Sequence, residues 1–403
     1  LAVNMKKIDV GLWRSLLSRP NGTNGNAGEG PPLPLTAISL KTPELEAFGH
    51  KLSDLEARAS LGREGGWRAD LKSRDVTGEL FWKGQGSGRL GARLKQLVIN
   101  QATPHVGGDA AAAAEDGSVG PSNPEDLPGL DIEVDQFTLR GKAFGKLKLA
   151  ADNHEGAWEA RLDIENDDGK LSGSGRWRPH TTQADTQLNF TLTAKSIEKL
   201  LARLGYVDAV KRGKATLEGK VAWNGAPFAI DYPTLGGDLK VDAEGGQFNK
   251  LEPGVGRLLG ILSLQSLPRR ITLDFRDVFS QGFAFDSING QLTMHNGIIE
   301  TNNLQIRGPA AKVLMTGSAN VPQETQNLKV RVQPAIGESI AVGAMVVNPA
   351  AGAIAWLAQK VLRDPIDQAF AFEYAVTGSW ADPKVEKISG PQPRTETPVE
   401  KKN

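Results

Sequence analysis

The sequence predicts a mainly β protein: a long, bent antiparallel sheet forming an open, repeat-like groove, with a few helices concentrated towards the C-terminus. Three observations predict this fold. Apolar and polar residues alternate with a period of two in about 20 short runs, as expected of strands that bury one face. Several segments resemble one another along the chain. The 46 glycines also fit many short strands joined by tight turns.

The alternating runs define the strands. "WEARLDI" (158–164) places Trp158, Ala160, Leu162 and Ile164 on one face, and the same pattern occurs in "TQLNFTLTA" (186–194), "RRITLDF" (269–275) and "FAFEYAVTGSW" (370–380). Side chains two residues apart in a strand point to the same side of a sheet. These runs therefore predict sheets with one apolar and one polar face.

Repetition indicates an elongated architecture. Residues 48–71 align with residues 140–162, and 286–306 form a looser third copy. A shorter phrase, in which Gly follows an apolar residue by two positions, recurs in 170–177, 216–223, 313–319 and 375–380. Gly at such positions thins the sheet face and lets it bend. A β-sandwich would use the same strands, but repetition without any sign of closure favours a long open sheet.

Segments of low complexity suggest where the chain divides. Residues 19–34 and 103–129 are rich in Gly, Pro, Asn and Ala, and 389–403 form a polar tail that we expect to be disordered. We expect five parts: 1–35, the end of an upstream groove segment and a linker; 36–126, a β-groove repeat with the Ala-rich insertion; 127–250, a second repeat with a short helix; 251–388, a C-terminal region with apolar helices; and 389–403, the tail.

Helical patterns are few. Residues 196–205 have Ser196 as N-cap and Gly205 as stop, and 252–268 form a short apolar helix. Residues 339–362 include 21 consecutive uncharged positions, which is the length of a membrane-spanning helix. Pro349 divides that segment into parts of about 13 and 20 Å, each shorter than a hydrocarbon core of about 30 Å. A helical hairpin packed on the sheet and one that dips into a bilayer both fit.

Composition excludes several functional classes. Lys plus Arg and Asp plus Glu both number 47, so no net charge attracts nucleic acid or anionic lipid. The absence of cysteine excludes disulfides, thiolate metal sites and a cysteine nucleophile, and it favours an oxidising compartment. The five histidines are isolated, with no partner at metal-ligand spacing. We therefore expect no metal site and no nucleic-acid partner.

No catalytic constellation emerges. "GSGRLG" (86–91) matches a dinucleotide fingerprint but lacks the βαβ unit that such a loop needs. Asp274 and Asp277 in "LDFRD" fall on opposite faces of a strand, which indicates a salt-bridged outer face rather than an acid–base pair. We expect no enzyme, no catalytic residue and no cofactor. A carbohydrate-active β-sandwich would need paired carboxylates in a cleft, and the sequence offers no convincing pair.

One region resembles a known family. The long block 252–299, followed by "IRGPAAKVLMTGSA" (306–319) and "YAVTGSWADPKVE" (374–386), resembles the C-terminal region of AsmA-like proteins, especially their large YhdP-type members in Gram-negative bacteria. Residues 202–225 resemble the same group, and the resemblance covers about residues 36–388. The Ala-rich insertion and the charged tail depart from the family pattern at loop positions.

The resemblance implies a very large protein that spans the periplasm. Its N-terminal helix, absent from this chain, would anchor it in the inner membrane, and its gutter-like β-structure would take part in phospholipid movement and outer-membrane biogenesis. Phospholipids would be its ligands. The inner leaflet of the outer membrane, reached through the C-terminal helices, and other envelope proteins would be its partners. The alternative is a periplasmic scaffold or assembly factor for outer-membrane biogenesis that has no lipid conduit.

The predicted mechanism is that an apolar inner face shelters acyl chains from water. The residues expected to line this groove are Leu217, Val221, Leu273, Phe275, Phe283, Phe285, Leu304, Ile306, Val330 and Val332. Those expected to contact a membrane are Leu258, Leu259, Ile261, Leu262, Val346, Val347, Ile354, Trp356, Leu357 and Val361.

The two apolar helical segments generate a first prediction. The chain should float with neutral liposomes at both low and high salt, because apolar contact and not net charge would hold it there. Replacing Trp356 and Leu357 with Ser should weaken flotation. If the chain does not float in either condition, and lipid leaves tryptophan fluorescence unchanged, residues 339–362 are a buried helical hairpin.

Overall fold

The computed structural model describes residues 2–5, 7–9, 36–47, 50–62, 65–84, 88–99, 123–179, 184–249, 282–334 and 371–389. The predicted helices at 252–268 and 339–362 lie outside these residues, as does the strand predicted at 269–275. The chain divides into two compact units. We call residues 1–192 with 222–231 the N-terminal unit, and residues 193–221 with 232–403 the C-terminal unit.

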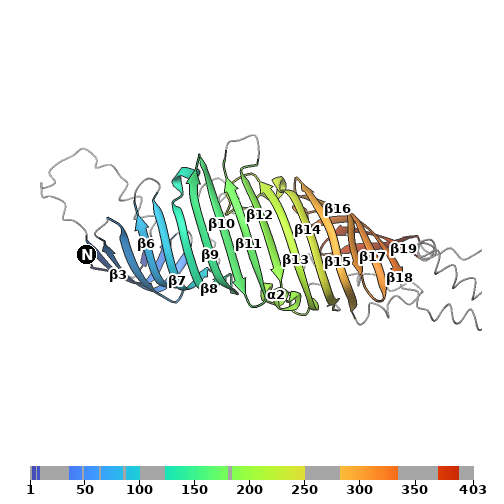
Figure 1. The fold of residues 1–403 in the computed structure, drawn as a ribbon, viewed down its shortest axis with the longest axis horizontal. Coiled ribbons are helices and arrows are strands. Elements are labelled where there is room, and N and C mark those ends of the chain that lie inside the picture. The colour runs from blue at the N-terminus through green and yellow to red at the C-terminus, as the bar shows by residue number, and fades with distance from the viewer. Residues whose placement is uncertain are drawn as a thin grey trace, which may run out of the picture. The chain divides into compact units, whose positions relative to one another are not determined.

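The N-terminal unit is a run of strands with one short 3₁₀ helix, η2 (Pro124–Asp126). Figure 1 shows most of them side by side in chain order. The strands are β1 (Ala2–Asn4), β2 (Lys7–Asp9), β3 (Ala37–Ala47), β4 (His50–Leu61), β5 (Trp67–Lys72), β6 (Val76–Lys83), β7 (Arg89–Ile99), β8 (Gly129–Leu139), β9 (Lys142–His154), β10 (Ala157–Asn166), β11 (Gly169–Trp177) and β12 (Thr186–Ala194).

The C-terminal unit contains α2 (Ile197–Leu204), the only α-helix of the described residues, and η3 (Tyr232–Thr234). Its strands are β13 (Val210–Trp223), β14 (Gly236–Phe248), β15 (Phe283–His295), β16 (Ile298–Arg307), β17 (Ala311–Asn320), β18 (Thr325–Pro334), β19 (Phe372–Ser379) and β20 (Pro383–Ser389). From β14 to β20 each strand pairs antiparallel with the next.

The N-terminal unit follows the same meander with two exceptions. Strands β3 to β7 and β8 to β11 pair antiparallel with their sequence neighbours, but β1 and β2 run parallel to β3, and β7 runs parallel to β8. A parallel pair needs a crossover of a dozen or more residues. The chain between Ile99 and Gly129 provides that length. The Ala-rich insertion therefore lies in the connection between β7 and β8, where the pairing switches from antiparallel to parallel.

The mainly β, open-sheet prediction is confirmed. In the described part of each unit, no pairing joins the first strand of the meander to the last. The internal repeat corresponds to β-hairpins: residues 48–71 contain β4 and most of β5, 140–162 contain β9 and much of β10, and 286–306 cover most of β15 and β16 with the turn between them. Each copy is thus one turn of the meander.

The helix predicted at 196–205 is also confirmed. The Ser196 hydroxyl accepts a hydrogen bond from the Lys199 amide at 3.3 Å, and Gly205 ends the helix with a φ of 100°. Ile197 and Leu201 pack against the apolar core of the C-terminal unit. An Arg212 amide donates to the Glu198 carboxylate at 2.8 Å, which ties α2 to the start of β13.

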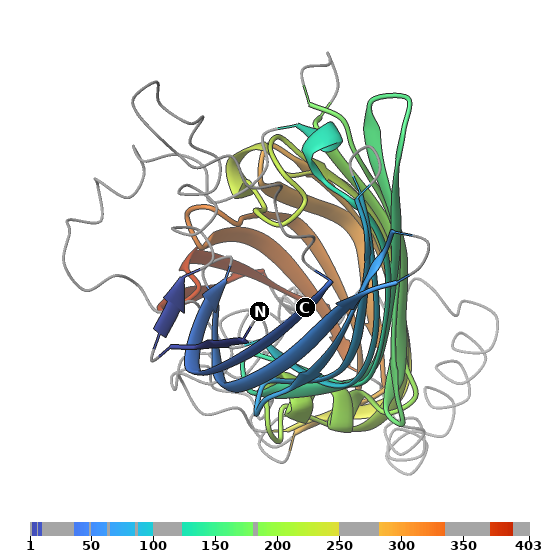
Figure 2. The same cartoon turned by 90° about the vertical axis from the view of Figure 1, so that its left-hand side faces the viewer.

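Glycine allows the strands to bend. Figure 2 shows that the blue strands of the N-terminal unit and the orange strands of the C-terminal unit curve along their length. In β17, Gly317 has a φ of 122°, and a Cβ atom there would lie 2.3 Å from the Asn327 carbonyl oxygen of β18. Only glycine tolerates both the conformation and the contact. Gly317 belongs to one of the recurring Gly phrases, so this position supports the bending role predicted from sequence.

Gly317→Ala should lower the free energy of unfolding by about 3 kcal/mol, because it adds a backbone collision to an unfavourable φ. The matched control is Gly156→Ala in the β9–β10 turn, where φ is 72° and a Cβ atom meets nothing within 4 Å. That change should cost about 1 kcal/mol. Urea unfolding of both variants measures the difference, and equal costs would contradict a close strand approach at Gly317.

Candidate functional site: an apolar sheet face

The C-terminal unit carries an apolar face built from residues in register across neighbouring strands. Ile288, Ile306, Val313, Val332 and Phe372 follow one another on β15 to β19, each paired with the next. Val313 is 0% exposed and Ile306 is 1% exposed. Side chains directly opposite in adjacent strands lie close enough to pack, so this row forms one continuous apolar surface.

Two further rows extend that face. Leu304, Met315, Val330 and Tyr374 form the second row, and Leu328, Val376 and Val385 form the third. All these residues belong to one buried cluster. At the β14–β15 pair the cluster continues through Phe248 and Phe285, whose ring centroids lie 5.1 Å apart. Burial also raises the pKa of the Tyr374 hydroxyl above its ordinary value.

Six of the ten residues predicted to line a groove lie together in this cluster: Phe283, Phe285, Leu304, Ile306, Val330 and Val332. Leu217 and Val221 are partly buried on β13. Leu273 and Phe275 lie outside the described residues, and so do all ten residues predicted to contact a membrane. The prediction omitted Val313, Met315 and Tyr374, although period-two alternation in "AKVLMTGSA" and "FAFEYAV" marks each of them.

The N-terminal unit has longer apolar rows. One row crosses nine strands, β3 to β11: Leu40, Ala57, Leu71, Gly78, Leu94, Val134, Leu147, Ile164 and Leu171. A parallel row contains Ile38, Ala59, Ala69, Leu80, Ala92, Ile132, Leu149, Leu162 and Gly173. Leu94, Val134 and Leu147 are buried, whereas Leu71, Leu80, Ile132, Leu149 and Leu162 retain partial exposure.

The opposite face of the N-terminal unit carries exposed ion pairs. Nearest N–O distances lie between 2.5 and 3.8 Å for Lys41–Glu56, Arg68–Glu79, Arg93–Asp131, Lys148–Glu133, Lys170–Asp163 and Arg176–Glu159. Ion pairs this exposed contribute little to stability, because water screens them. Their effect is to keep this face hydrated, which leaves the apolar rows as the face that can hold an apolar ligand.

Hydrogen bonds set the ionisation of two carboxylates on that charged face. The Arg93 guanidinium donates to Asp131 at 2.9 Å and holds the pKa of that carboxyl below its usual value. The Ser172 hydroxyl donates to Asp163 at 2.6 Å and, with help from Lys170, lowers the pKa of Asp163. Both groups stay charged at neutral pH and fit a purely structural role.

Across the described residues, no group of three or more His, Asp or Glu side chains could hold a metal ion. In the same part of the chain, no helix is long and apolar enough to cross a membrane. The most extended feature of the described residues is the apolar face of each unit, whose side chains suit contact with hydrocarbon.

Comparison with known proteins identifies relatives of the chain. Residues 1–385 match the family described as YhdP protein. The Intermembrane phospholipid transporter YhdP of Escherichia coli (strain K12) is 25% identical over 401 residues, which cover 98% of this chain and 31% of the relative. The chain therefore spans less than a third of the length of that relative. No solved structure matches.

The assignment of faces can be tested by exchanging polarity at matched positions. Val330 is 1% exposed on the apolar face. Val330→Thr should lower the free energy of unfolding by about 1–3 kcal/mol, because it buries a hydroxyl among apolar side chains. Thr316→Val, on the opposite face of the neighbouring strand, should change it by less than about 0.5 kcal/mol. Chemical denaturation measures both, and a reversed order would contradict the assignment.

Proposed function

Because this chain belongs to the YhdP family, we propose that it is part of a bridge-like lipid transporter that shelters phospholipid acyl chains in a hydrophobic β-groove. In this proposal the groove lies in the periplasm, within a longer protein anchored in the inner membrane, and leads towards the outer membrane. Segments 252–268 and 339–362 contact the outer membrane. The protein performs no covalent chemistry.

One observation carries the proposal: the two apolar rows of the N-terminal unit cross nine strands and keep partly exposed side chains along most of that length, although Ala92, Leu94, Val134 and Leu147 are buried. Soluble proteins rarely leave a large contiguous apolar surface uncovered unless it binds something. Here Leu71, Leu80, Ile132, Leu149 and Leu162 present methyl groups without a competing charge in their rows. An acyl chain is the ligand whose chemistry matches that surface.

The direction of the rows suits movement along the sheet. Rows run across the strands, so nine strands spaced about 4.8 Å apart give a track of about 40 Å in the N-terminal unit. Leaving such a track for water costs about 0.8 kcal/mol per methylene group. Sliding from one strand to the next keeps the methylenes covered. The rows therefore favour transfer along the track over release from its side.

A periplasmic scaffold without a conduit is the second candidate. The observation that favours it is the burial in the C-terminal unit, where Val313, Ile306 and Val330 are at most 1% exposed. A sheet whose apolar side chains are fully covered holds a core rather than an open track. The two functions differ in whether phospholipid reaches the apolar rows, which an experiment can measure.

The chain contains no cysteine, so a single introduced cysteine can report on one position. We select Leu162→Cys in the second apolar row and Arg161→Cys as its control, because adjacent strand residues face opposite sides. Each variant is labelled with a polarity-sensitive fluorophore and mixed with phospholipid vesicles. The label at 162 should shift to shorter wavelength, and spin-labelled phospholipid should quench it severalfold more than the label at 161.

Phospholipid that co-purifies with the unlabelled chain, detected by native mass spectrometry, would give independent support. Leu162→Asp should reduce this bound lipid, whereas Arg161→Asp should not. Equal quenching at both positions, together with no co-purified phospholipid, would reject the conduit and support the scaffold.

A further inference from the structure

The charged face of the C-terminal unit departs from the pairing seen on the N-terminal unit. On β16 and β17, Arg307 lies directly opposite Lys312, and the same row continues to Ser287 on β15 and Gln333 on β18. Like charges directly opposite each other in a sheet are destabilising. The one acid of this row is Glu244 on β14, which lies opposite Ser287 and is therefore two strands away from Arg307. This arrangement therefore contrasts with the six cation–carboxylate pairs of the N-terminal unit.

The neighbouring row adds a third cation. From β14 to β19 it contains Asp242, Asn289, Gln305, Leu314, Arg331 and Glu373, and the Asn289 amide donates to the Asp242 carboxylate at 3.0 Å. Glu373 stands opposite Arg331, but it forms an ion pair with Lys329 at 2.9 Å. The Arg331 Nε atom is buried and has no hydrogen-bond partner. Over the residues that the structure describes, neither Lys312 nor Arg331 forms an ion pair. Buried polar atoms are almost always satisfied, so this guanidinium calls for an acceptor.

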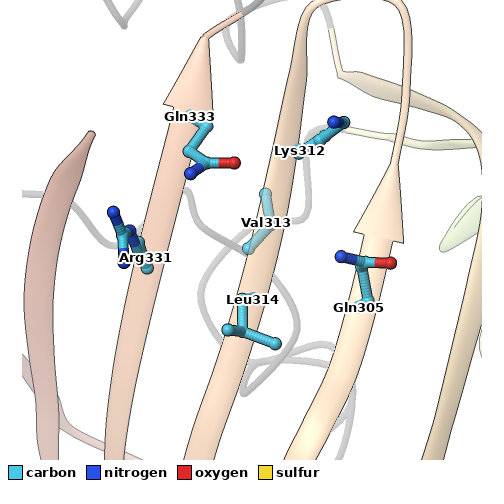
Figure 3. A pocket seen from close by; sticks show the side chains of 6 residues that line it. All are labelled: Gln305, Lys312, Val313, Leu314, Arg331 and Gln333. Atoms are coloured by element: carbon cyan, nitrogen blue, oxygen red, sulfur yellow. The ribbon is translucent and has the colours of Figure 1, made fainter. Parts of the chain in front are cut away.

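A small hollow lies between these two rows. Its volume is about 90 Å³, and Gln305, Lys312, Val313, Leu314, Arg331 and Gln333 line it. Figure 3 shows these side chains on three adjacent strands, β16 to β18. The hollow has room for a few water molecules or one group of phosphate size, and not for a sugar or a nucleotide.

One hydrogen bond fixes the orientation of the Gln305 side-chain amide at the hollow. The Arg307 Nε–H group donates to the side-chain amide oxygen, Oε1, of Gln305 at 2.9 Å. This bond occupies the acceptor end of the Gln305 amide, so its NH₂ group remains available to donate. Gln333 supplies a second amide on the other side of the hollow. The lining thus combines two cations with amide donors, which is the donor set that recognises oxyanions.

We propose that this hollow binds a phosphate-type oxyanion. The Arg331 guanidinium and the Lys312 ammonium group hold its charge, and the Gln305 and Gln333 amides donate to its remaining oxygens. A bound phosphate would carry about −1.5 to −2 charges and offset the repulsion between Arg307 and Lys312. The site lies on the face opposite the apolar rows, so it goes beyond the proposed acyl-chain track and does not depend on it. A free phosphate ion and a phospholipid headgroup share this chemistry.

Equilibrium dialysis of the whole chain against radiolabelled inorganic phosphate tests the proposal. At constant ionic strength, set with chloride, one phosphate should bind per chain and saturate. Lys312→Gln and Arg331→Gln should each weaken binding about tenfold or more. Lys170→Gln and Arg176→Gln are matched controls on the N-terminal unit, where each cation has a carboxylate partner. These should change binding less than threefold.

The urea unfolding midpoint, measured with and without phosphate, gives a second test of the proposed site. A general loss of positive charge would not produce the same pattern of midpoints. Without phosphate and at low salt, Lys312→Gln should leave the urea midpoint unchanged or raise it, because it removes the repulsion with Arg307. Phosphate should raise the midpoint of the unsubstituted chain and not that of Lys312→Gln. Absence of saturable phosphate binding, or equal weakening by the control variants, would overturn the proposal.

Vesicles distinguish the two sources of phosphate. If a lipid headgroup occupies the site, inorganic phosphate should reduce flotation with phosphatidylglycerol vesicles, and Arg331→Gln should reduce it too, whereas vesicles of a phosphate-free glycolipid should be unaffected. If flotation is the same in all cases while dialysis shows saturable binding, the ligand is a soluble phosphate ion.

Discussion

Cross-strand register is the constraint on which the rest of the structure depends. Side chains alternate between the two faces of a strand, so a one-residue slip would move an apolar row to the charged face. In the N-terminal unit the row from Leu40 to Leu171 stays in phase across nine strands. It does so although the β6–β7 register shifts between Thr77 and Gly78. The extra residue is absorbed there, and Gly78 still pairs with Leu94 on the apolar side.

Register also places the two kinds of stabilising interaction, apolar burial and ion pairing, on opposite faces of the sheet. The apolar rows stabilise the fold through burial, at about 25 cal/mol per Å² removed from water. The exposed ion pairs of the opposite face contribute little stability, and their main effect is to keep that face hydrated. Both units contain a buried apolar cluster, but burial varies along the rows: Val313 and Ile306 of the C-terminal unit are fully covered, whereas Leu149 and Leu162 of the N-terminal unit are only partly covered. The same alternating pattern therefore contains both fully buried and partly exposed apolar positions.

Local pattern was sufficient to predict the strands and α2, because alternation and capping act over a few neighbouring positions. Alternation also marked six apolar residues that the structure places in one cluster, and their role in lining a groove stays a prediction. Contacts between strands could not be predicted in this way. Nothing local to β7 or β8 shows that they pair in parallel, since that pairing depends on where the chain returns after a long insertion. Likewise, the opposition of Arg307 and Lys312 follows from the β16–β17 register and from no property of either segment alone. Val313 and Met315 were missed although their alternation was visible.

The anion-binding hollow and part of the apolar cluster are built on opposite faces of β16, β17 and β18. A change in the register of these strands would therefore alter both faces at once. Along β16, Gln305 and Arg307 face the charged side while Leu304 and Ile306 face the apolar cluster, and β17 and β18 alternate in step. Repulsion between Arg307 and Lys312 acts against the pairing that aligns Ile306 with Val313. The buried row tolerates that repulsion because slipping by one residue would expose it to water. Hydrophobic burial thus holds the cations close together, and an anion bound in the hollow beside Lys312 would weaken the repulsion that opposes this register.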